Sequence, residues 1–433
     1  MTSTAPTYDP GTQAMHYVRR ALRRPARAFR RNVLPRLFRP TPAPDIATVR
    51  AVRVVGLLSS ASGIGKSARL CMETVEHAGY AVSCANVAAL FDSDDRLPIP
   101  AGTAGAPAGA PAGAPAGALA ADLSIYHLNP PMLLLGMVGS GLRSYARSYN
   151  IGYWAWELEA LPREWIAALP FVHAVLVPSR FCRDAVARYT DKPVLVVPHP
   201  VAAPSPSLRP DRPDAGGRFR AVQIFNYGSS FERKNPIALV RAFRSAFGDD
   251  PTAELVLKTS RGDRHPQDKD RLVAEVADAP NIRLIDETWE PGRIDDLLRS
   301  ADVYASLHRS EGFGLPLAEA MMLEVPVLAT NWSGNVDFCH PETSFPVDCE
   351  LVAFGDGHSD YEQVHDARWA EPSVAHAAAQ LRRVRADPAA ARTMAVSAKA
   401  RLEAHLERHS YERAIATLQR VQAAPAPGTG ARR

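Results

Sequence analysis

Short apolar runs alternate with longer amphipathic stretches along residues 52–200, and this pattern predicts strands separated by helices. The first run, 52–58, is followed by a turn of small residues and by a helix-forming stretch that reaches about Ala78. Further strands are predicted at 123–128, 151–155, 174–177 and 194–197. Such alternation favours a parallel sheet, so we expect an α/β domain at 51–201. A repeat of Gly, Ala and Pro at 101–118 is typical of a flexible surface insertion within it.

The same alternation returns after residues 202–218, which are rich in Pro, Gly and polar residues and are typical of an interdomain linker. Strands are predicted at 219–225, 254–259, 282–285, 303–306 and 325–329, and helices at 236–247, 268–277, 293–300 and 316–323. This pattern predicts a second α/β domain at 219–372. Helices are predicted at 373–422 and a disordered tail at 423–433. Two such domains place a ligand in the cleft between them, near the C-terminal ends of strands.

The most informative segment is EGFGLPLAE, residues 311–319. It sets Glu311 and Glu319 eight positions apart around a Gly-x-Gly turn and a Pro that can open a helix near Leu315 or Pro316. Glu319 is then expected in the first turn, and Glu311 in the loop before it. Glycines allow close backbone approach, and a helix start offers free N–H donors, so the segment suits a ligand with sugar hydroxyls and phosphates. The alternative is a surface loop before an amphipathic helix.

Composition sets the class of protein but hides an asymmetry in charge. The length of 433 residues favours two domains, and 46% hydrophobic with 22% charged residues is a normal globular balance. The formal net charge is +4, yet residues 1–50 contain ten Arg and two Asp, about +8, which leaves about −4 for the rest. The basic and apolar residues of 14–39 predict either binding to an anionic membrane surface or a solvated arginine tail. Nucleic-acid binding is disfavoured because the basic excess stops at this tail.

Several features point to a cytoplasmic protein, with a peripheral position on the inner face of the membrane if the tail binds lipid. No apolar run reaches about 18 residues, and 132–138 is better interpreted as a buried helix. The N-terminus lacks the apolar region of a secretory signal. The five cysteines show no CxxC spacing, which fits a reducing compartment and neither a disulfide framework nor a zinc site.

These residues also resemble a known family. The 311–321 segment, with 301–304 before it and 325–330 after it, is similar to the signature of retaining glycosyltransferases of the GT-B fold, family 4. Supporting segments occur in the expected order at 150–158, 177–181, 197–201, 229–236 and 257–259. The resemblance covers residues from roughly 52 to 400, and the 101–118 insertion lies outside it. It implies two Rossmann-like α/β domains facing a cleft, with a helical C-terminal segment.

The resemblance also implies roles in binding a nucleotide-diphosphate sugar as donor substrate. Glu311 would contact the transferred sugar, and Glu319 the ribose hydroxyls. The backbone around Gly312, Phe313, Gly314 and Leu315 would meet the sugar and the diphosphate. In the first domain, Gly63 and Gly65 resemble the family's glycine loop near the donor phosphate and the acceptor.

A departing diphosphate needs positive charge, and family 4 enzymes work without a metal, so we expect no metal and no other cofactor. Lys234 is the first candidate. Family members often carry an Arg about five residues earlier, where this chain has Ser229, so either Arg233 substitutes or Lys234 acts alone. Lys258, at a strand end, is a further candidate. A DxD metal site at 92–94 is disfavoured because this polar loop lies far in sequence from the donor motif.

Three first-domain features have competing interpretations. Residues 65–67 read Gly-Lys-Ser, as at the end of a P-loop, but Ser60 stands where that motif requires Gly. His127 ends a strand where the family often has a His touching the sugar, and a hydrogen-bonded structural histidine is the equal alternative. A cluster of aromatic residues either stacks on a sugar or, more often, packs a core; it comprises Tyr153, Trp154, Trp156 and Trp165.

The sequence thus predicts a hexosyltransferase that retains anomeric configuration in bacterial-type glycan or polysaccharide biosynthesis. Its acceptor would be a saccharide, a lipid-linked saccharide or a protein. The alternatives are a GT-B nucleotide-sugar epimerase or phosphorylase, and a non-catalytic nucleotide-sugar-binding protein. The donor base, the sugar, the acceptor and the oligomeric state carry no readable signal in the sequence.

Overall fold

The computed structural model describes residues 36, 38–60, 62–91, 97–99, 121–201, 217–358, 361–362 and 364–424. Several predicted segments therefore lie wholly or almost wholly outside the described residues: the basic segment 14–39, the 92–94 loop, the 101–118 insertion, the 202–218 linker and the 423–433 tail.

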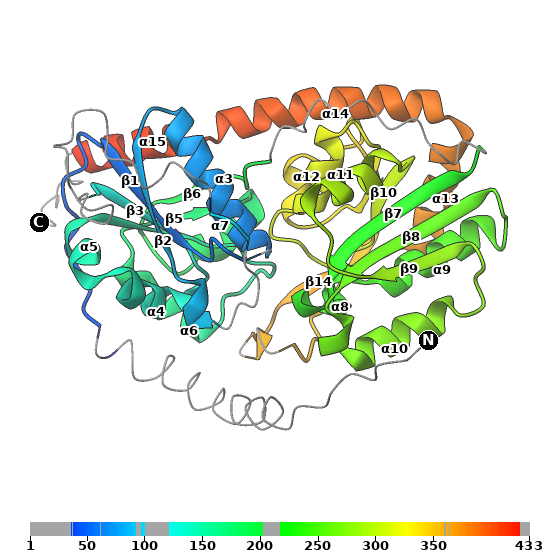
Figure 1. The fold of residues 1–433 in the computed structure, drawn as a ribbon, viewed down its shortest axis with the longest axis horizontal. Coiled ribbons are helices and arrows are strands. Elements are labelled where there is room, and N and C mark those ends of the chain that lie inside the picture. Colours follow the sequence, from blue (N-terminus) through cyan, green and yellow to red (C-terminus); the bar gives the residue numbers. More distant parts are fainter. Residues whose placement is uncertain are drawn as a thin grey trace, which may run out of the picture.

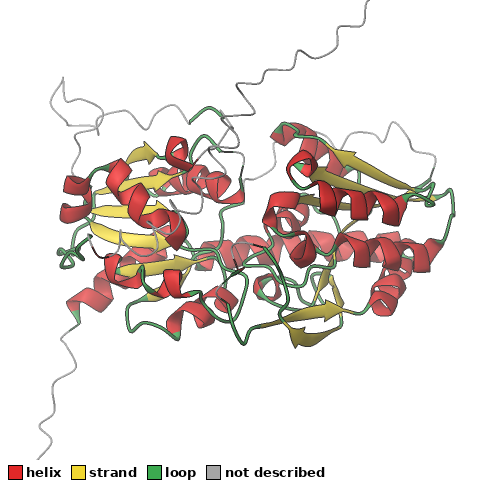
Figure 2. Ribbon diagram, turned by 90° about the horizontal axis from the view of Figure 1, so that it is seen from below, coloured by secondary structure: helices red, strands yellow, loops and turns green. Residues whose placement is uncertain are grey.

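The first lobe is a six-stranded parallel sheet with helices on both faces (Figures 1 and 2). Its elements are β1 (Ala51–Gly56), α3 (Gly63–His77), β2 (Ala81–Asn86), β3 (Leu123–His127), α4 (Pro130–Ser140), α5 (Leu142–Arg147), β4 (Tyr149–Tyr153), α6 (Arg163–Ile166), β5 (Ala174–Val177), α7 (Arg180–Ala187) and β6 (Val194–Val196). The strand order is β2-β1-β3-β4-β5-β6. The central strands β3, β4 and β5 are buried along their whole length, as continuous apolar runs covered on both faces require.

The second lobe repeats this architecture. Its elements are β7 (Phe219–Asn226), α8 (Phe231–Lys234), α9 (Pro236–Phe247), β8 (Ala253–Ser260), α10 (Pro266–Val276), β9 (Ile282–Asp286), α11 (Pro291–Arg299), β10 (Val303–Ser306), α12 (Leu315–Met322), β11 (Val327–Thr330) and β12 (Phe345–Val347). The strand order is β12-β11-β10-β7-β8-β9, and every pair is parallel. The order in which successive strands are added to the sheet reverses between β7 and β10, and in the first sheet between β1 and β3. These switch points are where open parallel sheets bind ligands.

Two C-terminal segments tie the lobes together. The antiparallel pair β13 (Cys349–Ala353) and β14 (Arg368–Pro372) leads to α13 (Val374–Ala386), α14 (Pro388–Arg408) and α15 (Tyr411–Ala423). Helix α14 packs on α12 in the second lobe, and α15 crosses to pack on α3 in the first (Figure 1). Between β13 and β14, Tyr361 packs on Trp156 with ring centroids 5.6 Å apart. Each lobe therefore includes core residues from distant parts of the sequence.

The predicted alternation of strands and helices is confirmed, with small shifts at element ends. The apolar run at 132–138 lies within α4, and the helical pattern at 373–422 divides into α13, α14 and α15. Four strands were not predicted: β2, whose sequence AVSCAN mixes polar and apolar residues, and β12, β13 and β14. No helix within the described ranges is long and apolar enough to cross a bilayer.

Two glycines at the start of α3 test how tightly the first switch point is packed. A Cβ on Gly65 would lie 2.6 Å from the Ser60 carbonyl oxygen and 2.7 Å from that of Leu57, whereas a Cβ on Gly63 would meet nothing within 4 Å. We predict that Gly65→Ala lowers the free energy of unfolding by about 1–3 kcal/mol, because backbone atoms must move. Gly63→Ala should change it by less than about 1 kcal/mol. Urea denaturation of both variants compares them, and equal effects would contradict the packing described.

Candidate active site

The second-lobe switch point brings the predicted donor residues together. The loop after β7 contains Arg233 and Lys234 on the short helix α8, and the loop after the adjacent strand β10 contains Glu311. Helix α8 is flanked by two non-glycine residues with positive φ, Ser230 at +66° and Asn235 at +47°. Such backbone conformations cost energy and tend to occur at functional sites. They turn the chain sharply at both ends of α8.

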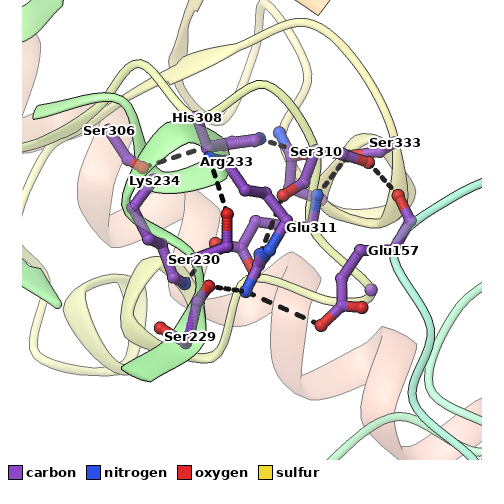
Figure 3. Close-up of polar contacts among 12 residues, drawn as sticks. Glu157, Ser229, Ser230, Arg233, Lys234, Ser306, His308, Ser310, Glu311 and Ser333 are labelled. Carbon is purple, nitrogen blue, oxygen red and sulfur yellow. Dashed lines mark hydrogen bonds and ion pairs between the residues drawn. The ribbon is translucent and has the colours of Figure 1, made fainter. Parts of the chain in front are cut away.

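A buried cluster of charges lies where these loops meet (Figure 3). Lys234 pairs with one oxygen of Glu311, and Arg233 Nη1 lies 3.1 Å from the other. Arg233 is 3% exposed and also donates to the carbonyl oxygens of Ser310 and Ser229, each at 2.9 Å. Its Nη2 lies 3.6 Å from a carboxylate oxygen of Glu157, which belongs to the first lobe. The guanidinium therefore joins residues of both lobes.

The electrostatics of the cluster favour an ionised carboxylate. Burial alone would raise the pKa of Glu311, but the charges of Lys234 and Arg233, with His308, outweigh it and lower that pKa to about 2. Burial lowers the pKa of Lys234, and Glu311 opposes that shift. One carboxylate thus serves two buried cations. The Glu157 carboxylate, 3.6 Å from Arg233, brings the formal charge of the four side chains to zero.

The loop 311–314 is fixed by contacts with the first lobe. Ser179, the N-cap of α7, donates its hydroxyl to the Gly312 carbonyl at 2.6 Å, and a Cβ on Gly312 would lie 3.0 Å from the Trp156 carbonyl oxygen. Gly314 has φ +89°, a conformation that favours glycine, and immediately precedes α12. The helix begins at Leu315, so the predicted start near Leu315 or Pro316 is confirmed. The glycines here serve both close packing and the turn into the helix.

Glu319 occupies a different position from the one expected. It is the fifth residue of α12, and the first turn contains no acidic residue, so the expectation of a first-turn carboxylate is wrong. Its carboxylate pairs with Lys66, which lies at the start of α3 in the first lobe. Burial raises the pKa of Glu319, and the charge of Lys66 opposes that shift. The two carboxylates therefore each hold a lysine, one from the same lobe and one from the other.

The first-lobe candidates lie at the other switch point, and they differ in how far they are exposed to solvent. Gly63 and Gly65 lie in the first turn of α3. His127 is 0% exposed, stacks on Tyr153 with centroids 4.4 Å apart, and contacts Ser67 Oγ at 3.4 Å and Tyr411 Oη at 3.4 Å. Burial, together with the nearby His199, places its pKa well below the usual range. His127 is thus a neutral, enclosed histidine in this structure.

The remaining predicted residues are buried, and their side chains contact residues outside the charge cluster. Lys258 is buried on β8, and its ammonium donates to the carbonyls of Thr259 and Glu287. Phe313 is 2% exposed and packs on His199 and Phe338. The aromatic cluster is buried core, with exposures of 0% for Tyr153 and Trp154 and 2% for Trp156 and Trp165. Within the described ranges, no group of three or more His, Cys, Asp or Glu side chains could hold a metal ion.

Two residues of the site had no role assigned from sequence. Glu157 lies in the motif segment 150–158 but has no local feature that marks it as a partner of Arg233. Lys66 appears in the sequence only as part of an incomplete P-loop. Both residues join the site through contacts between the lobes. The residues next to them in the sequence therefore do not indicate their role, which depends on the side chains that they meet in the other lobe.

Comparison with known proteins agrees with this geometry. Two parallel Rossmann-like sheets whose switch points face one site define the GT-B class of glycosyltransferases. The family model "Family 4 Glycosyltransferase in conflict systems" matches residues 179–418, more than half of the chain. The chain therefore belongs to this glycosyltransferase family, and the predicted GT-B fold is confirmed.

Solved structures of low sequence identity share the fold. HepE from Anabaena, in complex with UDP and glucose, has a TM-score of 0.55 and 14% identity over 87% of this chain and 98% of that one. A TarM mutant from S. aureus, in complex with fondaparinux, α-GlcNAc-glycerol and UDP, has a TM-score of 0.50 and 12% identity. That match covers 70% of this chain and 55% of TarM, so the chain spans about half of TarM's length. A UDP-forming α,α-trehalose-phosphate synthase from Burkholderia vietnamiensis has a TM-score of 0.50 and 12% identity over 70% and 74% of the two chains.

The charge cluster gives a prediction for stability. Glu311→Ala leaves two buried cations without their shared carboxylate, so it should lower the free energy of unfolding by roughly 3–5 kcal/mol. Glu319→Ala should lower the free energy of unfolding by less than half as much. Its partner Lys66 is 35% exposed, so water can solvate the ammonium once the carboxylate is removed. Denaturation midpoints of the two variants compare them. The combination Glu311→Gln with Lys234→Met should cost less than the sum of the single changes, and strict additivity would contradict the coupling.

Buried histidines predict acid sensitivity. Burial lowers the pKa of His199 from 6.5 to about 4. Between these values the unfolded chain binds the proton and the folded chain does not, so stability should fall as pH decreases from about 6.5 to about 4, by up to about 3 kcal/mol from this residue. His199→Gln should flatten that slope, while the same change at the exposed His77 should not. Urea titrations at several pH values measure how the free energy of unfolding depends on pH. An unchanged slope in His199→Gln would contradict the lowered pKa of His199.

Proposed function

We propose that the protein transfers a hexose from a nucleotide-diphosphate sugar to an acceptor with retention of anomeric configuration. The observation that carries this proposal is the pairing of Glu311 with two buried cations, Lys234 and Arg233, beside the glycine turn that opens α12. A diphosphate leaving group gains negative charge in the transition state, and fixed cations in a water-poor site stabilise it without reorganisation. The acceptor is a saccharide, a lipid-linked saccharide or a protein in glycan biosynthesis.

Each residue has a distinct part in the proposed reaction. Glu311 stays ionised across the physiological range, since its pKa is about 2, and accepts hydrogen bonds from the hydroxyls of the transferred sugar. Glu319 accepts from the ribose hydroxyls. Lys234 and Arg233 neutralise the departing diphosphate, and Arg233 takes the place of the earlier Arg that family members often carry at the position of Ser229. This charge distribution supports a reaction that uses no metal.

The leaving group departs on the same face of the sugar from which the acceptor attacks, in the front-face mechanism usually described for this family. No side chain is assigned as a nucleophile. The first lobe would bind the acceptor near the glycine loop of α3. The HepE and TarM structures named above contain UDP, which makes UDP-sugars the first donors to test. The basic segment 14–39 would hold the enzyme at an anionic membrane surface.

The test begins with a thermal-shift screen of UDP-, GDP- and ADP-sugars, because a ligand that binds only the folded state raises the melting temperature. The stabilising donor is then incubated with candidate acceptors, and product configuration is read by NMR. Lys234→Ala and Glu311→Gln should each lower kcat on the order of 10²–10³-fold. Lys399→Ala, which alters a pair with Glu324 just after α12, should leave kcat unchanged. Unchanged turnover in both site variants would overturn the proposal, and interconversion of nucleotide sugars without acceptor would indicate an epimerase.

A further inference from the structure

The proposed reaction assigns no role to Lys66, although it links the two lobes inside the site. Its ammonium pairs with Glu319 across the interface, and the two side chains are 35% and 17% exposed. The pair joins the first turn of α3, at one switch point, to α12, at the other. Lys66 is therefore a cation that the first lobe supplies to the donor side of the site.

The position of Lys66 is fixed by its neighbours. Ser62 caps α3 by accepting from the Gly65 amide at 3.3 Å. Arg69, one turn further along, donates to the carbonyls of Leu58 and Ser60, each at 2.8 Å, and so fastens the loop before the helix. Gly65 leaves no space for a side chain against that loop. The helix start is thus tightly anchored, and the flexible part is the four-carbon stem of the lysine.

The other end of the pair lies close to the expected diphosphate position. Glu319 is four residues beyond Leu315, the first residue of α12, which corresponds to about 6 Å along a helix axis. Gly314 caps this helix without a side chain, and Pro316 has no N–H. The Leu317 amide donates to the Gly314 carbonyl at 2.9 Å, which leaves the Leu315 amide in this turn for an anion. To meet an anion at that helix start, the ammonium bound at Glu319 would move by rotation of its own four-carbon stem.

We propose that Lys66 is a donor-binding residue that exchanges partners. It pairs with Glu319 as the structure shows, and it moves to the diphosphate when the ribose hydroxyls bind Glu319. The diphosphate carries more negative charge than one carboxylate, so the exchange favours the bound donor and draws the first lobe onto it. This inference rests on the proposed function. It adds a contact from Lys66 of the first lobe to a donor that the second lobe binds.

The experiment separates the phosphates from the nucleoside. Binding of UDP, GDP and ADP, and of uridine, guanosine and adenosine, is measured by calorimetry on the full chain and on Lys66→Met. For the nucleotide that binds the unchanged protein most tightly, Lys66→Met should raise Kd on the order of tenfold to a hundredfold, as expected for loss of one charge-assisted hydrogen bond. The Kd of its nucleoside should stay the same or fall, because Glu319 loses a competing partner. The salt dependence of nucleotide binding should also weaken.

Lys399→Met is the matched control, since Lys399 is 31% exposed and pairs with Glu324 near the other end of α12. It should leave both Kd values unchanged. If Lys66→Met leaves the nucleotide Kd unchanged, Lys66 is structural and the inference fails while the proposed function stands. If nucleotide and nucleoside both bind more tightly, Lys66 only competes for Glu319, and the inference fails again. If none of the three nucleotides binds the unchanged protein, both proposals fail together.

Discussion

Two buried cations held by one carboxylate impose the main constraint on this molecule. Removing an ion from water costs several kcal/mol, so Arg233 and Lys234 are stable in the interior only while Glu311 remains ionised between them. The tight turns at both ends of α8 and the glycine turn into α12 place these side chains together, and backbone carbonyls satisfy part of the guanidinium. The formal charges of Arg233, Lys234, Glu311 and Glu157 sum to zero, so an added anion would compete with these carboxylates for the two cations.

The site belongs to neither lobe alone. Arg233 contacts Glu157, Ser179 donates to the Gly312 carbonyl, and Lys66 pairs with Glu319, so several contacts cross the interface within one region. Both switch points lie at the C-terminal edges of parallel sheets, and the contacts between the lobes hold the two glycine loops on the same site. Relative movement of the lobes would therefore change the charge around the donor site as well as its width.

The sequence predicted most of the scaffold because buried parallel strands are continuous apolar runs. The spacing of the 311–319 segment singled out Glu311 and the start of α12, and Lys234 became a candidate through its place before a helix and the family resemblance. Prediction from the sequence failed where the decisive contact is distant. Strand β2 mixes polar and apolar residues, and its position is set by pairing with β1. His127 is enclosed because Tyr411 covers it from α15, 284 residues away in sequence. Glu157 and Lys66 join the site through contacts between the lobes, and a local sequence pattern does not predict such contacts.

The crossing of α15 to the first lobe has a consequence for synthesis of the chain. Tyr411, Ile415 and Leu418 are buried in a core cluster with Val52, Val54 and other residues of the first sheet. That core stays incomplete until the ribosome has produced residues near 418, well after the second lobe's own strands have emerged. Although domains usually fold in the order in which they are made, here the lobe made first would be finished last, and its exposed apolar face would need protection during translation.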